Sequence, residues 1–108
     1  GATSGQLTYY KPGMGACGNW NGEGDAIVAI SHIVYDEGNR DGNPNNNAHC
    51  GRQIKITSVH GLPADQVVTV QDRCKCEGCA AGDLDVPEQL FQTFAPSSAG
   101  RIPVEWYW

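Results

Sequence analysis

The chain has 108 residues, with 12 acidic and 7 basic side chains and a formal charge of −5, so it is long enough for one domain and is acidic overall. This charge argues against nucleic acid as a partner, because phosphate binding depends on clustered Lys and Arg. The longest apolar run, residues 26–30, is too short to cross a bilayer, and we expect no membrane partner. With 14 Gly and 6 Pro, the composition indicates a turn-rich fold of short strands.

Short stretches rich in β-branched and aromatic residues, bounded by turn-forming residues, predict strands. In chain order they are Gln6–Tyr10, Ala26–Ser31, Gln53–Val59, Gln66–Gln71 and Arg101–Trp108. The second is almost continuously apolar, which is typical of a central strand covered on both faces. The third and fourth flank a turn at residues 60–63 and predict a β-hairpin. In the last strand the alternate residues from Ile102 to Trp108, including Trp106, are apolar and are expected to face the core.

Two further segments complete the predicted fold. Residues Asp36–His49 lack apolar periodicity and are rich in turn-forming residues, which predicts a long surface loop. Residues Pro87–Ala95 predict one short helix that begins with a proline, whose missing N–H costs nothing at that position. Leu90, Phe91 and Phe94 would share the apolar face of this helix. Short strands with one helix and no repeats favour a small, mostly antiparallel closed barrel, which leaves no exposed sheet edge.

The chain contains five cysteines, a number typical of secreted domains that supplement a small core with disulfides. A zinc site is the alternative, but the trio Cys74, Cys76 and Cys79 has no second Cys-x-x-Cys pair elsewhere, so we expect no metal and no cofactor. The most economical pairing joins Cys17 to Cys50, and Cys79 to either Cys74 or Cys76. One thiol is then left over, so a disulfide-linked dimer is the alternative to the expected monomer.

Three parts of the sequence taken together resemble a known family. They are Thr8-Tyr9-Tyr10 with Gly15-Ala16-Cys17-Gly18, then Val68-Thr69-Val70-Gln71-Asp72-Arg73-Cys74, and finally Asp83-Leu84-Asp85-Val86 leading to Ala99-Gly100-Arg101-Ile102-Pro103-Val104. In order and spacing they are similar to the expansin-related double-psi β-barrel proteins. The Asn-rich run at residues 43–47 is similar to the loosenins, which are single-domain fungal expansin-like proteins.

The resemblance implies a mainly β fold, namely a six-stranded double-psi β-barrel with one or two short helices and stabilising disulfides. It also implies a secreted, extracellular protein with a polysaccharide-binding groove. We expect residues 1–108 to form this single barrel domain, without the second, carbohydrate-binding domain of full-length expansins.

Hydrolysis of a glycosidic bond normally needs two carboxylates, one on each side of the bond. Asp85 matches the acid of the related endoglucanases, whereas Lys11 stands near the position of their second aspartate and is cationic at neutral pH. Because one carboxylate is missing, we expect a protein that is not a hydrolase, with Asp85 as an acid-like, vestigial catalytic residue.

Five further residues of the groove are implied by the resemblance or by side-chain chemistry. Thr8 and Asp72 match groove positions of expansins and, like Asp85, offer hydrogen bonds to sugar hydroxyls. Tyr9, Tyr10 and Trp20 offer flat apolar surfaces to the faces of sugar rings. Adjacent residues of a strand point to opposite faces, so only one of the two tyrosines is expected to meet the ligand.

Each acidic candidate also has a purely structural interpretation. Asp85 with Glu88, three residues later, fits a capping box at the start of the predicted helix. Asp72 and Arg73 fit a surface ion pair, worth at most about 1 kcal/mol. The three histidines are too scattered to form a recognisable ligand set.

We therefore expect a loosenin-like protein that binds plant or fungal cell-wall polysaccharide, such as cellulose or chitin, and loosens it without hydrolysis. The first alternative is a lytic enzyme of the endoglucanase or lytic-transglycosylase type, in which Asp85 acts as the acid. The second is a cysteine-protease inhibitor or defence-related protein on the same barrel, acting through the loop Asp36–His49.

Overall fold

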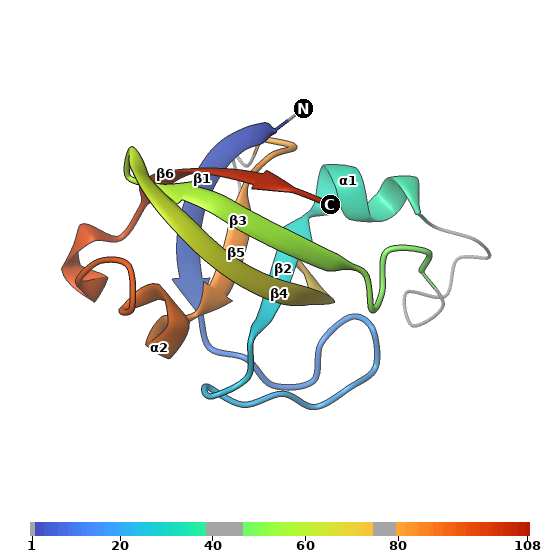
Figure 1. Cartoon of the computed structure of the whole chain (residues 1–108). Coiled ribbons are helices and arrows are strands. Elements are labelled where there is room, and N and C mark those ends of the chain that lie inside the picture. Colours follow the sequence, from blue (N-terminus) through green and yellow to red (C-terminus); the bar gives the residue numbers. More distant parts are fainter. Residues whose placement is uncertain (1, 39–46, 75–79) are drawn as a thin grey trace.

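The computed structural model describes residues 2–38, 47–74 and 80–108. These residues form six strands that close into a barrel in the order β1-β5-β2-β4-β3-β6 (Figure 1), so the predicted closed six-stranded barrel is confirmed. The strands are β1 (Thr3–Tyr10), β2 (Ile27–Ser31), β3 (Gln53–Val59), β4 (Leu62–Cys74), β5 (Leu84–Pro87) and β6 (Ile102–Tyr107). The pairs β1/β5 and β2/β4 are parallel, and the other four pairs are antiparallel.

The barrel interior is filled by the inward-facing residues of all six strands, as their alternation predicts. Every residue of β2 is buried, which confirms that this strand lies at the centre of the fold. The largest fully buried side chains include Trp106, Tyr35, Phe91, Leu7, Ile30, Ile54, Ile56, Leu84 and Ile102. No helix in the described part of the chain is long and apolar enough to cross a membrane.

The hairpin between β3 and β4 forms as predicted, but its turn is tighter than the sequence suggested. Only His60 and Gly61 connect the strands, and both have positive φ angles, of 55° and 78°. Leu62 and Pro63, which were assigned to the turn, instead pair with Val59 and Ser58. A two-residue hairpin turn needs positive φ angles at both of its positions. The residues on either side of such a turn, here Val59 and Leu62, then belong to the paired strands.

Short helical turns differ most from prediction. The first, α1 (His32–Glu37), was not predicted; it lies before the predicted loop Asp36–His49 and overlaps it only in its last two residues. It begins at Ser31, whose side chain accepts a hydrogen bond from Ile33 N–H, and it is fixed by burial of Tyr35. Residues 39–46 of the predicted loop lie outside the described residues.

The helix predicted over Pro87–Ala95 is limited to α2 (Glu88–Phe91), and a 3₁₀ turn, η2 (Ser97–Ala99), follows it. Leu90, Phe91 and Phe94 still pack on the core, so the apolar face was assigned correctly. After Phe91 the chain continues in turns in which the N–H groups of Thr93 and Phe94 bond to the oxygens of Leu90 and Phe91, three residues back, so the regular helix ends there.

The sixth strand, β5, was not identified as a separate strand by its sequence, since four residues give too short a pattern to read. It forms by pairing with β1 on one side and β2 on the other. Asp85 lies inside this strand, and the N-cap of α2 is Pro87, with no capping side chain among the described residues. The capping box of Asp85 and Glu88 is therefore wrong.

Trp106 and Trp108 were both expected to face the core, and only Trp106 does. Its indole N–H donates to Gly82 O at 2.9 Å, whereas Trp108 is 43% exposed. Trp108 follows the last residue of β6 and has no strand opposite it. Instead it stacks on His49, with the Arg52 guanidinium 3.7 Å from the centre of its ring.

The predicted disulfide between Cys17 and Cys50 is present and joins the segment after β1 to the turn before β3. The alternatives for the second disulfide involve Cys76 and Cys79, which lie outside the described residues. That pairing stays a prediction.

Candidate functional site

Four neighbouring strands carry a row of residues on the outside of the barrel. Thr8 of β1 lies opposite Asp85 of β5. Ala29 of β2 lies between Asp85 on one side and Asp72 of β4 on the other. The two aspartates are therefore two strand spacings apart, about 9–10 Å between backbones. We call these four positions the acidic row.

Asp72 reaches this row through a β-bulge in β4. Val28 lies opposite Val70, but the next residue of β2, Ala29, lies opposite Asp72, so Gln71 is an extra residue. In a regular strand Asp72 would point the same way as Val70, into the barrel. The bulge turns its carboxylate outward, beside Ala29.

The loop between β1 and β2 holds the bulge in position. The backbone N–H of Cys17 donates to Gln71 O at 3.2 Å, and the side chain of Asn19 donates to Gln71 Oε1 at 2.9 Å. From the same loop, the N–H of Ala16 donates to Asp72 Oδ1 at 2.8 Å. The Cys17–Cys50 disulfide anchors this loop to the barrel. The loop and the bulge therefore fix Asp72 together.

The ion pair between Asp72 and Arg73, considered as an alternative role, does not form. The guanidinium of Arg73 instead makes two 2.8 Å hydrogen bonds to the carboxylate of Asp36 in α1. These bonds lower the pKa of Asp36. Arg73 contacts Asp72 through its backbone N–H, at 2.8 Å, and this bond, like the one from Ala16, ends on Oδ1 of Asp72.

Asp85 is the group of the row whose protonation is most altered. Burial raises its pKa to about 6; Arg101 opposes this rise, and Asp83 and Asp72 add to it. A carboxyl group with this pKa changes between donor and acceptor of hydrogen bonds in mildly acidic solution. It can therefore bind a sugar hydroxyl in either state.

The two adjacent tyrosines of β1 face opposite ways, as predicted. The Tyr9 ring packs on Phe91, with 5.0 Å between ring centres, and its hydroxyl donates to Ser97 O at 3.0 Å. Tyr10 instead lies near the row, where the charges of Asp72 and Asp85 act on its hydroxyl. Burial, followed by the charges of Asp72 and Asp85, raises the pKa of Tyr10, so its hydroxyl stays protonated.

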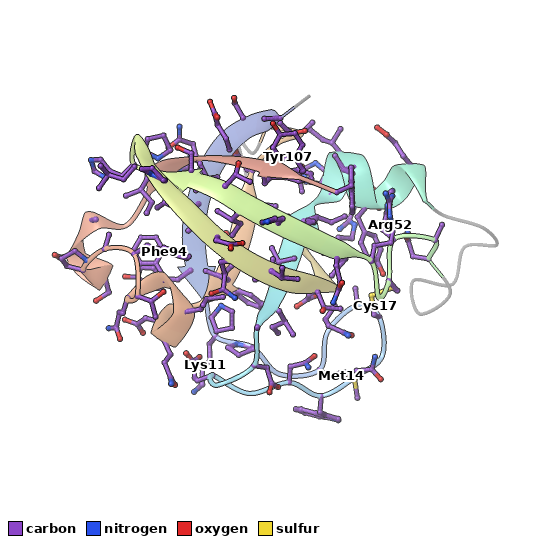
Figure 2. All side chains as sticks on the ribbon, viewed as in Figure 1. Lys11, Met14, Cys17, Arg52, Phe94 and Tyr107 are labelled. Atoms are coloured by element: carbon purple, nitrogen blue, oxygen red, sulfur yellow. A yellow bond between two sulfur atoms is a disulfide. The ribbon has the colours of Figure 1, made fainter. Side chains whose placement is uncertain are left out.

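A hollow of about 450 Å³ adjoins the row and is lined by Tyr9, Tyr10, Lys11, Glu23 and Glu88. Lys11 lies at the start of the loop below the barrel in Figure 2, where the resemblance led us to expect the missing carboxylate. Glu23 reaches this place from the loop and accepts a hydrogen bond from the N–H of Gln89 in α2 at 3.3 Å. Glu23 acts electrostatically on Tyr10 and was not among the predicted site residues.

Trp20 is presented on the same loop and is 74% exposed. It forms an isolated β-bridge with Met14, which is also exposed and is labelled at the bottom of Figure 2. Two exposed apolar side chains on one disulfide-anchored loop give a surface that the barrel does not bury.

The structure therefore brings Thr8, Asp85, Asp72 and Tyr10 together, and turns Tyr9 toward the core. Ala29 and Glu23 were missed by sequence reasoning. Ala29 was read only as part of a buried apolar run, and its place between two acids depends on the pairing of β2 with two other strands. No sequence signal distinguished Glu23 from the other acidic loop residues.

No family model matches the chain. A protein of Arthroderma benhamiae described as an "Allergen Asp f 7 homolog" is 37% identical over an alignment of 91 residues that covers 82% of this chain. The chain spans 27% of the length of that relative.

Solved structures show similarity over the whole barrel. The Streptomyces papain inhibitor superposes with a TM-score of 0.75 at 24% identity, covering 100% of this chain and 96% of the inhibitor. A mutant expansin of Clavibacter michiganensis in complex with cellohexaose gives 0.72 at 26% identity, and the apo expansin gives 0.71 at 27%. Each expansin comparison covers 99% of this chain and 50% of the expansin chain. The predicted fold, an expansin-like double-psi β-barrel with a disulfide, is thereby confirmed.

Proposed function

We propose that the protein is a secreted, loosenin-like protein that binds a chain of cell-wall polysaccharide along the acidic row and loosens the polymer without cleaving it. Cellulose and chitin are the polymers we favour. Sugar hydroxyls would hydrogen-bond to Thr8, Asp85 and Asp72, replacing contacts between polymer chains. The Cys17–Cys50 disulfide is consistent with secretion.

The observation that carries this proposal is the outward alignment of Thr8, Asp85 and Asp72 across four adjacent strands. Such a linear array of hydroxyl and carboxyl groups suits an extended chain of sugars better than a compact ligand. The cellohexaose complex of the similar expansin, of which this chain covers half, supports a polysaccharide ligand in general.

A lytic reaction is the second candidate, and one observation favours it. Asp85, with a pKa raised to about 6, has the property of a general acid that protonates a leaving-group oxygen. The residue at the sequence position expected for a second carboxylate, however, is Lys11, and the carboxylate that reaches this place, that of Glu23, is engaged by the N–H of Gln89. We therefore favour binding without cleavage.

The binding site is tested by calorimetric titration of the protein with cello- and chito-oligosaccharides. Asp72→Asn keeps the shape of the side chain but removes its charge, and we expect about tenfold weaker binding because hydrogen bonds to charged groups contribute about 1.5–3 kcal/mol. Asp65→Asn removes the same charge from an exposed residue that is paired with Lys55, and it should bind like wild type. Equal affinity of wild type and Asp72→Asn would rule out the acidic row as the binding site.

A further inference from the structure

Arg101 stands at the β6 end of the acidic row. Gly100, with a φ of 69°, turns the chain from η2 into β6. Ile102 then pairs with Leu7, so the antiparallel register brings Arg101 beside Thr8. Its positive charge acts on Asp85 and opposes the rise in the pKa of that residue. Arg101 therefore continues the row by one strand, and with the opposite charge.

Arg101 forms no ion pair with the acidic residues that the structure describes. Within residues 2–38, 47–74 and 80–108, the ion pairs are Lys55 with Asp65 and Arg73 with Asp36. Arg101 is exposed and has no carboxylate within ion-pair distance among these residues. Its guanidinium is free to bind an anionic group of a ligand.

A second hollow begins at Arg101 and runs over the outside of the β1/β6 pair. Its volume is about 580 Å³, and its lining includes Ser4, Gln6, Ser58, Asp83, Arg101 and Glu105. The two carboxylate oxygens of Asp83 already accept hydrogen bonds from the N–H groups of Gln6 and Ala80, at 2.9 and 3.0 Å. These bonds hold the Asp83 carboxylate against the backbone, and Glu105 lies four residues along β6 from Arg101. The Arg101 end of the hollow therefore offers a guanidinium to a ligand.

This charge pattern distinguishes between classes of polysaccharide. A polymer with a carboxylate on every sugar would place negative charges against Asp72 and Asp85, which is unfavourable. A neutral chain with isolated carboxylates can place neutral sugars over the two aspartates and one carboxylate on Arg101.

We propose that Arg101 is a specificity-determining residue that binds a carboxylate substituent of an otherwise neutral polysaccharide, placed in the hollow beside the acidic row. This inference rests on the proposed function, because it assumes that sugars occupy the row. A uronic acid side group on a neutral backbone is the substituent that fits this description. A lactyl ether on an amino sugar has the same carboxylate chemistry.

The test is calorimetry at pH 7 and low salt with a glucuronic-acid-substituted xylo-oligosaccharide and its carboxyl-reduced counterpart, which differ only in the charged group. We expect wild type to bind the acidic form about fivefold more tightly, as expected for one exposed charge pair. Arg101→Gln should bind both forms equally, and Arg101→Lys should keep part of the preference. The control is Lys55→Gln, which removes a positive charge from β3, outside the hollow. It should keep the full preference for the acidic form.

A parallel titration with peptide-free glycan strands, with and without their lactyl carboxylates, distinguishes the two sources of the substituent. A preference in either pair that is lost in Arg101→Gln supports the proposal, and the pair with the larger preference identifies the source. If wild type binds both forms of each pair equally, or if the preference persists in Arg101→Gln, the proposal is wrong while the proposed function stands. If wild type binds no oligosaccharide of any kind, both fail.

Discussion

Asp85 combines a position on the outside of the barrel with partial burial, and this combination determines its protonation. Burial disfavours the charged carboxylate and raises the pKa of Asp85 in the folded protein from its ordinary value of 3.8 to about 6. The folded state therefore holds the proton more tightly than the unfolded chain does. The contribution of Asp85 to the free energy of unfolding is largest below pH 4 and is lost as the pH rises through 6.

Asp85→Asn should remove this pH dependence, because the amide keeps the shape of the side chain without a charge to desolvate. We expect the variant to be more stable than wild type at pH 7, by roughly 3 kcal/mol at most, and to be little different at pH 4. Urea unfolding at a series of pH values measures both quantities. Parallel stability profiles of the two proteins between pH 4 and 7 would contradict a raised pKa of Asp85.

At the level of single residues, the sequence identified the acids of the row better than it identified their partners. Asp72 and Asp85 were placed by family resemblance, and their separation by Ala29 agrees with a common groove. The ion pair predicted between Arg73 and Asp72 was wrong. The actual partner, Asp36, is close in the fold but 37 positions away in the sequence. Trp108 was also misplaced, since alternation continues in the sequence beyond the last paired residue of β6.

Among the structural elements, the loop between β1 and β2 depends on close backbone contact with the β4 bulge. A side chain at Gly15 would collide with the backbone oxygen of Gln71. A Cβ at Gly24, in the same loop, would meet nothing within 4 Å. Only the first glycine is therefore required for the packing that positions Asp72.

Gly15→Ala should lower the free energy of unfolding by about 1–3 kcal/mol, the usual cost of overpacking, and should weaken oligosaccharide binding as Asp72 shifts. Gly24→Ala is the matched control and should change neither quantity. Denaturant unfolding and calorimetric titration of both variants test this expectation. If the two alanine variants behave alike, the bulge is not held by this contact.

The longer strands were predictable because their alternation of apolar and polar residues is a local signal. The hairpin of β3 and β4 and the buried strand β2 are examples. The four-residue strand β5 and the short helix α1 have no comparable signal, since each is stabilised by contacts with distant elements. The bulge at Gln71 was invisible for the same reason, because it exists only relative to β2.

For the molecule as a whole, the disulfide connects the loop that shapes the site to the rest of the barrel. Cys17 and Cys50 are separated by 33 positions, so the bond restricts a long segment of the unfolded chain. Replacing both cysteines with alanine should lower the free energy of unfolding by about 3–4 kcal/mol in the chain-entropy description. Thermal unfolding of the double variant against wild type measures the loss, and an unchanged melting temperature would contradict this role.

The distribution of charge over the whole surface also has a consequence for function. The protein is acidic, with a net charge of −5, and Asp72 and Asp85 lie in the row itself. A neutral polymer meets no net repulsion there, whereas a uniformly anionic one does. This pattern is the reason that neutral glycans are the favoured ligand class.

The most direct test of the central claim is incubation of the purified protein with insoluble cellulose, chitin and peptidoglycan. Protein depletion from solution and soluble oligosaccharides are measured in the same tubes, the latter by mass spectrometry. Binding without cleavage predicts depletion on cellulose or chitin without soluble products. Products that appear with wild type and vanish with Asp85→Asn would show instead that the protein is a lytic enzyme. Absence of depletion on all three polymers would contradict polysaccharide binding altogether.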